Sequence, residues 1–406
     1  MRLKVLTAAV AGLSFATTAA KAEFTNGTVK IGVLTDLSAT YSDFAGAGSV
    51  WAAKRAVEDY LKMKPGLKVE VISADHQNKP DIAANTARQW FDQDGVDMIA
   101  DNVTSSVALA VVAIAKEKNK VALVSGAASS DLSGKACTPN SIHWTYDTWA
   151  LANGTGSAVV KTGGDSWFFL TADYAFGHAL ERDTEAVVLK NGGKVLGKAR
   201  APFPTQDFSS FLLQAQASKA KIIGLANAGV DTTNSIKQAA EFGIVAGGQS
   251  LAGLLVVLSD VHALGLKTAQ GLTLTEAWYW DMTDANRAFA KDYAAANSGK
   301  HPNSIQAGVY SQVMHYLRAV DALQADGDGA AVVAKMKELP TDDALFGKGS
   351  VRADGRKIHD MYLFEVKKPE DSKGAWDYYK QRATIPAAEA WRPLADGGCP
   401  MVAAQK

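Results

Sequence analysis

The order of strand-like and helix-like segments along this chain constrains its fold more than any other feature. Strand patterns alternate with helical patterns from residue 29 to residue 125, and the alternation restarts at residue 165. In the first run, strands are predicted at 29–35, 67–74, 97–100 and 121–125, and helices at 46–61, 80–94 and 106–119. Such alternation is typical of parallel sheets with helices on both faces, so we predict an α/β protein.

The second run has the same form and leads into a less regular region. Its strands are predicted at 165–171, 194–200, 221–226 and 250–255, and its helices at 177–191, 208–218 and 232–242. Further strands are predicted at 271–275 and 361–366, and further helices at 284–298 and 304–325. Trp376 and Trp391 in the tail are assigned to core packing. A chain of this length exceeds what one hydrophobic core organises, so we predict two domains.

The first 22 residues have the layout of a secretory signal peptide. Arg2 and Lys4 form a basic start, residues 5–16 are uncharged and mostly apolar, and Ala20-Lys21-Ala22 is a small-x-small cleavage site. The apolar run is too short to span a bilayer as a helix. A buried N-terminal helix is the alternative interpretation. We expect an exported protein that resides in the periplasm after cleavage.

Charge and missing motifs exclude several classes of function. Without residues 1–22, 39 basic residues stand against 42 acidic ones, a formal net charge of −3. Nucleic acids and anionic membranes attract proteins with a basic excess, so neither is an expected partner. The sequence has no dinucleotide fingerprint, phosphate loop, nucleophile elbow or paired histidine spacing. We therefore expect no cofactor, no metal site and no enzymatic activity.

The chain has two cysteines, Cys137 and Cys399, and both lie in loops flanked by Pro or Gly. In an exported protein, an even pair of cysteines most simply forms a disulfide. The alternative, a catalytic cysteine, requires a histidine and an asparagine or aspartate close in space. We predict the disulfide, which would tie the C-terminal tail to the middle of the chain.

Three loops after predicted strands of the first run are candidates for a ligand site. They cover 38–44, 102–106 and 126–130, they are small and rich in hydroxyl groups, and two of them lead directly into a helix. Ligands of open parallel sheets bind beyond the carboxyl ends of the strands. Free N–H groups at a helix start bind anions, so we predict a carboxylate site. Helix capping by the same hydroxyls is the alternative.

Aromatic residues lie where the two predicted domains meet. Tyr146 follows the first run, and Tyr174 and Phe176 follow the first strand of the second run. Aromatic side chains at a domain boundary often line apolar ligand pockets, and core packing is the alternative.

Together, these segments resemble the solute-binding components of ABC importers, in the branched-chain amino acid and amide (Leu/Ile/Val-binding-like) family. The resemblance covers nearly the whole chain after residue 22, and it rests on segments 30–36, 102–106, 125–129, 171–177 and 206–209. It implies the type I periplasmic binding fold, in which two Rossmann-like lobes joined by a three-crossover hinge close on a ligand. We place lobe 1 at 27–145 and 276–350, lobe 2 at 146–275 and 351–390, and a tail that returns to lobe 1 at 391–406.

The resemblance also implies roles for individual residues. In that family, two loops of the first lobe hold the ligand carboxylate, and the matching positions here are Thr104, Ser105, Ser106, Ala127, Ala128 and Ser129. An aromatic residue of the first loop matches Tyr41 or Phe44. A second-lobe tyrosine that precedes a glycine matches Tyr174 less closely, because Ala175 and Phe176 intervene before Gly177.

Two departures from the family pattern bear on the ligand. Amino-acid binders of the family hold the α-ammonium group with an acidic residue from a late loop of the second lobe, and residues 252–257 contain no carboxylate. Asp231, in the loop 227–231, is a possible substitute. An unpaired ammonium group is costly in a closed site, so we expect an aromatic or other apolar acid, as in the subgroup that binds benzoate- or cinnamate-like acids. The candidate ligand-binding residues are Tyr41, Phe44, Thr104, Ser105, Ser106, Ala127, Ala128, Ser129, Tyr146, Tyr174, Phe176 and Asp231.

The expected function is that of a substrate-binding subunit, a monomer that delivers a small carboxylate to an ABC permease of the inner membrane. Three alternatives stay open at this point: a sensor subunit that presents ligand to a receptor kinase, a binder of branched-chain amino acids or amides, and an exported hydrolase. The hydrolase requires a nucleophile with an orienting base, and the sequence shows no such constellation.

Overall fold

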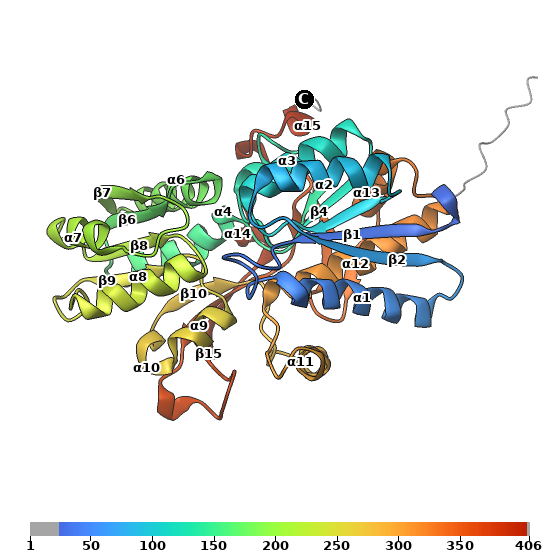
Figure 1. Ribbon diagram of the computed structural model, residues 1–406. Coiled ribbons are helices and arrows are strands. Elements are labelled where there is room, and N and C mark those ends of the chain that lie inside the picture. The colour runs from blue at the N-terminus through green and yellow to red at the C-terminus, as the bar shows by residue number, and fades with distance from the viewer. Residues whose placement is uncertain (1–23, 404–406) are drawn as a thin grey trace, which may run out of the picture.

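Two α/β lobes lie side by side in the computed structural model, which describes residues 24–403 (Figure 1). Lobe 1 is built on a five-stranded parallel sheet and lobe 2 on a four-stranded parallel sheet. The predicted two-lobed α/β fold is therefore confirmed. The predicted signal peptide lies outside the described residues. No helix within residues 24–403 combines the length and the apolar character that crossing a bilayer requires.

Lobe 1 contains the first predicted run. Its strands are β1 (Val29–Thr35), β2 (Val69–Asp75), β3 (Met98–Asp101), β4 (Val121–Val124) and β5 (Ser141–His143), in the order β2-β1-β3-β4-β5. Its connecting helices are α1 (Gly46–Met63), α2 (Pro80–Asp92) and α3 (Ser105–Glu117). The central strands β3 and β4 are buried at every residue because helices cover both faces of the sheet, whereas the edge strand β2 is half-buried or exposed along its length. The strand order changes direction between β1 and β3, so the loops that follow these strands open onto the crevice where ligands bind in such sheets.

Lobe 2 contains the second run. Its strands are β6 (Ser166–Ala172), β7 (Lys194–Ala201), β8 (Ile222–Ala226) and β9 (Ser250–Gly253), in the order β7-β6-β8-β9. Its helices are α4 (Thr148–Leu151), α5 (Ser157–Lys161), α6 (Ala175–Lys190), α7 (Ser209–Ala217), α8 (Val230–Glu241), α9 (Leu258–Leu264) and α10 (Leu266–Ala269), and a π-turn spans Ala152–Gly156.

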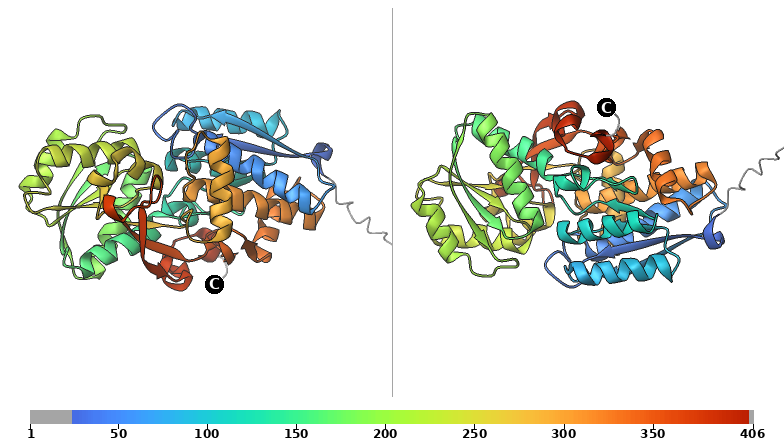
Figure 2. Two further views of the ribbon diagram at one scale, coloured as in Figure 1. Left: turned by 90° about the horizontal axis from the view of Figure 1, so that it is seen from below. Right: turned by 90° about the horizontal axis from the view of Figure 1, so that it is seen from above.

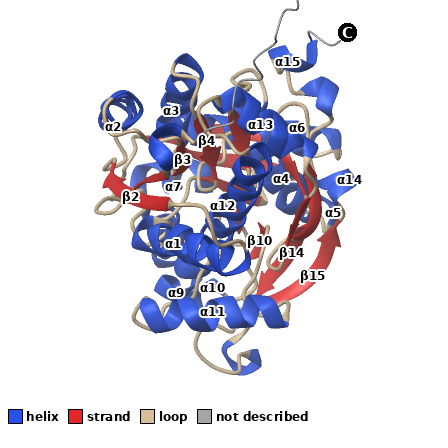
Figure 3. Cartoon of the chain, turned by 90° about the vertical axis from the view of Figure 1, so that its right-hand side faces the viewer, coloured by secondary structure: helices blue, strands red, loops and turns tan. Residues whose placement is uncertain are grey.

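The chain then returns to lobe 1, where orange helices lie beside the blue ones (Figure 2). These helices are α11 (Asp284–Ala296), α12 (Ser304–Leu323) and α13 (Gly329–Glu338), and a small antiparallel sheet of β11 (Thr341–Asp343), β12 (Gly347–Val351) and β13 (Lys357–Ile358) follows them. A second antiparallel sheet, visible at one side in Figure 3, contains β10 (Thr273–Glu276), β14 (Met361–Val366) and β15 (Tyr379–Ile385). The remaining short elements are 3₁₀ turns at Thr25–Gly27, Ser130–Ser133, Pro369–Asp371 and Leu394–Asp396, and helices α14 (Ala387–Ala390) and α15 (Pro400–Ala403). Trp376 and Trp391 are both buried.

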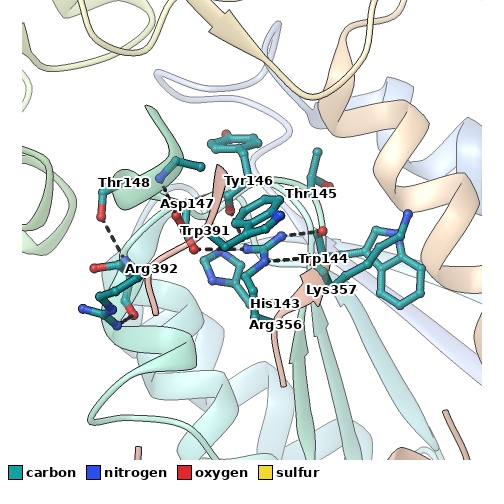
Figure 4. Close-up of polar contacts among 12 residues, drawn as sticks. His143, Trp144, Thr145, Tyr146, Asp147, Thr148, Arg356, Lys357, Trp391 and Arg392 are labelled. Carbon is teal, nitrogen blue, oxygen red and sulfur yellow. Dashed lines mark hydrogen bonds and ion pairs between the residues drawn. The ribbon is translucent and has the colours of Figure 1, made fainter. Parts of the chain in front are cut away.

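The segments that cross between the lobes are held together by the buried side chain of Arg356 (Figure 4). Its guanidinium donates hydrogen bonds to the carbonyl oxygens of Trp144 and Tyr146, the latter at 2.9 Å, in the segment that leads from β5 into lobe 2. The indole of Trp391 covers the guanidinium at 4.2 Å. Burial lowers the pKa of Arg356 to about 10, so the group stays charged at neutral pH. The chain crosses between the lobes after β5, after β10 and after β13, and Arg356 lies next to β13. Arg356 thus connects the first crossing segment to the third.

The predicted disulfide between Cys137 and Cys399 is present, with 5.6 Å between the two Cα atoms. It fixes the tail on lobe 1 close to the loop that follows β4. Arg392 strengthens the attachment, because its Nη2 donates a hydrogen bond of 3.0 Å to the carbonyl oxygen of Ser130.

We predict that Cys399→Ser lowers the free energy of unfolding by about 2–5 kcal/mol. The disulfide closes a loop of 262 residues, and losing it increases the conformational entropy of the unfolded chain. Urea denaturation of the variant and of the oxidised wild type measures the difference. Reduced wild-type protein serves as the control and should match the variant. Two free thiols in the oxidised wild type would contradict the prediction.

Candidate functional site

A small cavity lies where the loops of lobe 1 meet those of lobe 2. Its volume is about 210 Å³ including space open to solvent, and the enclosed part is narrow, with room for about one water molecule. The lining residues are Tyr41, Phe44, Val103, Ser105, Gly126 and Ala128 from lobe 1, and Tyr174, Phe176, Ala228 and Leu255 from lobe 2. The wall is mostly aromatic and aliphatic. Such a cavity suits a small apolar ligand with one polar group.

Six of the predicted site residues line this cavity, namely Tyr41, Phe44, Ser105, Ala128, Tyr174 and Phe176. Among them, Ser105 supplies a hydroxyl group that is already oriented. Its Oγ accepts a hydrogen bond of 3.1 Å from the backbone N–H of Ser129. The proton of the Ser105 hydroxyl is therefore free to be donated to a ligand oxygen.

The other predicted hydroxyl groups have different surroundings. Thr104 donates its hydroxyl hydrogen to the side-chain oxygen of Asn78, at 2.5 Å. Ser106 is half-buried on the first turn of α3 and does not line the cavity. The Ser129 Oγ accepts a 3.4 Å hydrogen bond from the N–H of Asp131 and so caps the 3₁₀ turn that follows. Helix capping, which the sequence analysis gave as the alternative to a carboxylate site, is therefore the role of the Ser129 hydroxyl but not of the Thr104 hydroxyl.

Ala127 and Tyr146 lie behind the cavity wall. The carbonyl oxygen of Ala127 is 2.8 Å from Nε2 of His143, and its methyl group packs in the core of lobe 1. The Tyr146 hydroxyl donates a hydrogen bond of 2.7 Å to the carbonyl oxygen of Gly126. Both residues hold the loop after β4 in place.

Three helices begin at the cavity without a side-chain cap. The N-cap residues of α3, α6 and α8 are Thr104, Tyr174 and Gly229, and none of these side chains accepts a hydrogen bond from its helix. The first N–H groups of a helix have no partner within the helix, and the helix dipole is positive at this end. Three such ends around one cavity favour a negatively charged group.

Asp231 lies in the first turn of α8 and is fully buried. Its Oδ1 accepts a 3.3 Å hydrogen bond from the N–H of Thr205, and its Oδ2 has no hydrogen-bond partner among the described residues. Burial raises the pKa of this carboxyl to about 7. Asp231 does not line the cavity, but it is near enough to add to the rise that burial produces in the pKa values of Tyr41 and Tyr174.

The two lobes are closed on the cavity. The hydroxyl groups of Tyr41 in lobe 1 and Tyr174 in lobe 2 share a hydrogen bond of 2.7 Å. The ring of Phe203 stacks on both tyrosines, with centroid distances of 4.3 Å to Tyr174 and 5.8 Å to Tyr41. Three aromatic rings therefore meet at the boundary between the lobes, where Tyr41 is buried and Tyr174 and Phe203 are half-buried.

A polar contact beside the cavity also joins the lobes. Ser130, at the end of the loop 126–130 that follows β4, donates its hydroxyl hydrogen to Asp183 of α6 at 2.6 Å. The neighbouring Arg182 forms an ion pair with Asp131 at 3.2 Å. Helix α6 thus carries cavity residues at its start and, two turns later, groups that bind lobe 1.

A family model described as "Periplasmic binding protein" matches residues 28–375. The chain belongs to this family. A periplasmic binding protein from Burkholderia mallei is 51% identical, and the match covers 93% of this chain and 100% of that one, with a TM-score of 0.90. A branched chain amino acid ABC transporter periplasmic ligand-binding protein from Burkholderia xenovorans is 41% identical over 92% of this chain and 100% of that one, with a TM-score of 0.82. The resemblance inferred from the sequence is confirmed.

A more distant structure shares the fold. It is the solute binding protein of an ABC transporter from R. palustris in complex with benzoate, which is 22% identical over 89% of this chain and 97% of that one, with a TM-score of 0.76.

In this periplasmic binding protein, four cavity residues were not predicted: Val103, Gly126, Ala228 and Leu255. All four belong to loops that the sequence analysis singled out, but they are apolar and carry no functional group. Phe203 was also missed, because it lies in the loop between β7 and α7, outside any strand or helix pattern. The sequence indicated these loops but not which of their apolar residues line a cavity, because small apolar residues after strands also occur in ordinary cores.

We predict that Asp231→Asn raises the free energy of unfolding at pH 8 by on the order of 2–4 kcal/mol and has little effect at pH 4. The pKa of this carboxyl is about 7 in the folded protein, above the value near 3.9 of an unfolded chain. The folded protein therefore binds more protons between these values, and its stability falls as the pH rises through this window. Asparagine has the same shape but cannot ionise.

Urea denaturation at pH 4, 6 and 8 measures the effect. Glu370→Gln changes an exposed carboxylate and serves as the control. Parallel pH profiles for wild type and Asp231→Asn would contradict the prediction.

Proposed function

We propose that this protein is the substrate-binding subunit of an ABC importer, exported to the periplasm by its first 22 residues, and that it captures a small acid with an aromatic or other apolar body. The observation that carries the proposal is the apolar cavity onto which Ser105 and three uncapped helix starts open. The importer role is supported by the 41% identical relative, whose name describes a periplasmic ligand-binding protein of an ABC transporter.

In this proposal, the polar part of the cavity binds the ligand carboxylate and the apolar part binds the rest of the ligand. The ligand carboxylate accepts hydrogen bonds from Ser105 and from free N–H groups at the helix starts, where the dipoles favour its charge. The apolar body lies among Tyr41, Phe44 and Phe176. Benzoate in the R. palustris protein is an acid of this kind on the same fold.

Capture proceeds by closure of the lobes, without a chemical step. Lobe 1 binds the carboxylate first, through Ser105 at the start of α3. Lobe 2 then covers the apolar body, and closure forms the hydrogen bond between Tyr41 and Tyr174. The closed form, as a monomer, delivers the ligand to the permease of the inner membrane.

A branched-chain amino acid is the second candidate ligand. The observation in its favour is the unpartnered Oδ2 of Asp231, since a carboxylate that gains an ammonium partner is stabilised in its charged form. The B. xenovorans relative, described as a branched chain amino acid ABC transporter periplasmic ligand-binding protein, also supports this candidate. Against it, Asp231 does not line the cavity.

We predict that the wild type binds benzoate and 4-hydroxybenzoate at least ten times more tightly than leucine or valine. An ammonium group inside the closed cavity loses its hydration without gaining a carboxylate partner there. Isothermal titration calorimetry of the mature protein measures the four affinities. If leucine binds more tightly than benzoate and Asp231→Asn abolishes leucine binding, the apolar acid is rejected as the ligand and the amino acid is supported.

We predict that Ser105→Ala combined with Ser129→Ala weakens benzoate binding by about 2 kcal/mol or more. The double variant removes the hydroxyl that faces the cavity and the hydroxyl that caps the following turn. Calorimetry with benzoate measures the loss. Ser106→Ala, a change on the same turn of α3 but outside the cavity, should leave the affinity unchanged. Undiminished binding by the double variant would place the carboxylate elsewhere.

A further inference from the structure

The cleft between the lobes contains a second, larger space next to the cavity. This outer chamber has a volume of about 870 Å³, including space open to solvent. Within the described part of the chain, Phe44 alone lines both the cavity and the outer chamber. Its neighbour in space, Tyr41, lines the cavity, and Gly229 lines the chamber.

The wall between the two spaces is narrow beside Phe44. A Cβ atom at Gly229 would lie 3.1 Å from the ring of Tyr41, so the start of α8 already touches that ring. The ring of Phe44 lies 5.5 Å from the ring of Tyr41, measured between centroids. Two aromatic rings and one glycine thus separate the cavity from the chamber.

Phe44 is fixed to lobe 1. Its carbonyl oxygen accepts hydrogen bonds of 2.9 Å from Nδ2 of Asn303 and 2.9 Å from Nε2 of Gln306, at the start of α12. The residue is only 4% exposed. Two side-chain amides thus hold the backbone from which the ring extends, and burial restricts the ring itself.

The outer chamber has a mixed lining, in which polar and charged side chains such as Asp43, Asp260 and Lys300 stand beside aromatic ones that an apolar chain can contact. Phe44, Tyr293 and Trp376 give it aromatic walls, with contributions from both lobes. The indole of Trp376 stacks between the imidazoles of His262 and His301, at centroid distances of 3.9 and 5.5 Å. Burial lowers the pKa of both histidines, which favours their neutral forms.

We propose that Phe44 sets the length of ligand that the cleft accepts. Its ring ends the cavity, so the wild type selects short acids, and a smaller residue at position 44 joins the cavity to the outer chamber and admits acids with a long apolar chain. This inference rests on the proposed function, because it takes a carboxylate as the group that the cavity holds.

The test uses three acids of increasing length: benzoate, 3-phenylpropanoate and 5-phenylpentanoate. Calorimetry of the wild type should give affinities that fall along this series. For Phe44→Ala, we expect benzoate to bind at least tenfold more weakly than to wild type and 5-phenylpentanoate at least tenfold more tightly. The affinities of Phe44→Leu for these acids should lie between those of wild type and Phe44→Ala. Phe44→Leu also provides the same comparison if Phe44→Ala does not fold.

Two further variants show where the long chain lies. Leu255→Ala enlarges the cavity away from Phe44, and it should keep the wild-type order of the three acids. Val230 lines the outer chamber and is 42% exposed, so it tolerates a larger side chain. Val230→Trp in the Phe44→Ala background should cancel the gain for 5-phenylpentanoate.

The outcomes separate this inference from the proposed function. If the wild type binds benzoate and the position-44 variants keep its order of affinities, the role of Phe44 is rejected and the proposed function stands. If Val230→Trp does not cancel the gain, the long chain lies outside the chamber and the inference is also rejected. If the wild type binds none of the three acids, the proposed function fails, and the role of Phe44 fails with it.

Discussion

The hydrogen bonds that Arg356 donates to the first crossing segment are the constraint on which the arrangement of the lobes depends. A segment that leaves a sheet loses the neighbouring strand, and a buried carbonyl without a partner costs about 1–3 kcal/mol. Arg356 supplies the missing donors at Trp144 and Tyr146 from a segment more than 200 residues further along the chain. The carboxylate of Asp147 lies 3.7 Å from the guanidinium and partly balances its charge. Arg356 therefore ties the first crossing segment to the third.

Residues around Arg356 also hold the loop 126–130 that follows β4. Tyr146, whose carbonyl oxygen is bound by Arg356, donates its own hydroxyl hydrogen to Gly126 in that loop. A few residues later, Ser130 is bound by Arg392 of the tail and by Asp183 of lobe 2. The loop after β4 is thus connected to the crossing segments, to the tail and to the opposite lobe. A ligand that contacts this loop acts on all the parts that must move during closure.

The sequence was sufficient to predict the elements with a clear apolar pattern, and insufficient for the short or polar ones. β4 is a continuous apolar run and β1 is mostly apolar, so both were placed within one residue. β5, with only three residues, and the small sheet of β11, β12 and β13 have no such pattern. Arg356 and Lys357 stand in a run that is typical of an exposed turn, yet both are fully buried. Their partners come from distant segments, and no local pattern contains that information.

Within the site, the sequence indicated the loops but could not distinguish the roles of similar residues. Thr104, Ser105 and Ser129 are all small hydroxyl residues in two neighbouring loops. Their roles differ because Thr104 donates its hydroxyl hydrogen to Asn78, whereas the Ser129 Oγ accepts a hydrogen bond from the N–H of Asp131 and lies outside the cavity lining. Only Ser105 is left facing the cavity. Val103 and Leu255 belong to the wall because the two lobes meet there, and this depends on the closed arrangement of the whole chain.

The disulfide gives the protein different stabilities on the two sides of a membrane. Its cysteines are separated by 262 residues, so all of lobe 2 is synthesised before Cys399 can reach Cys137. Reducing conditions in the cytoplasm keep both thiols free, whereas the periplasm favours their oxidation. The reduced chain is therefore less stable than the oxidised one. It gains the covalent constraint only where its two thiols are oxidised.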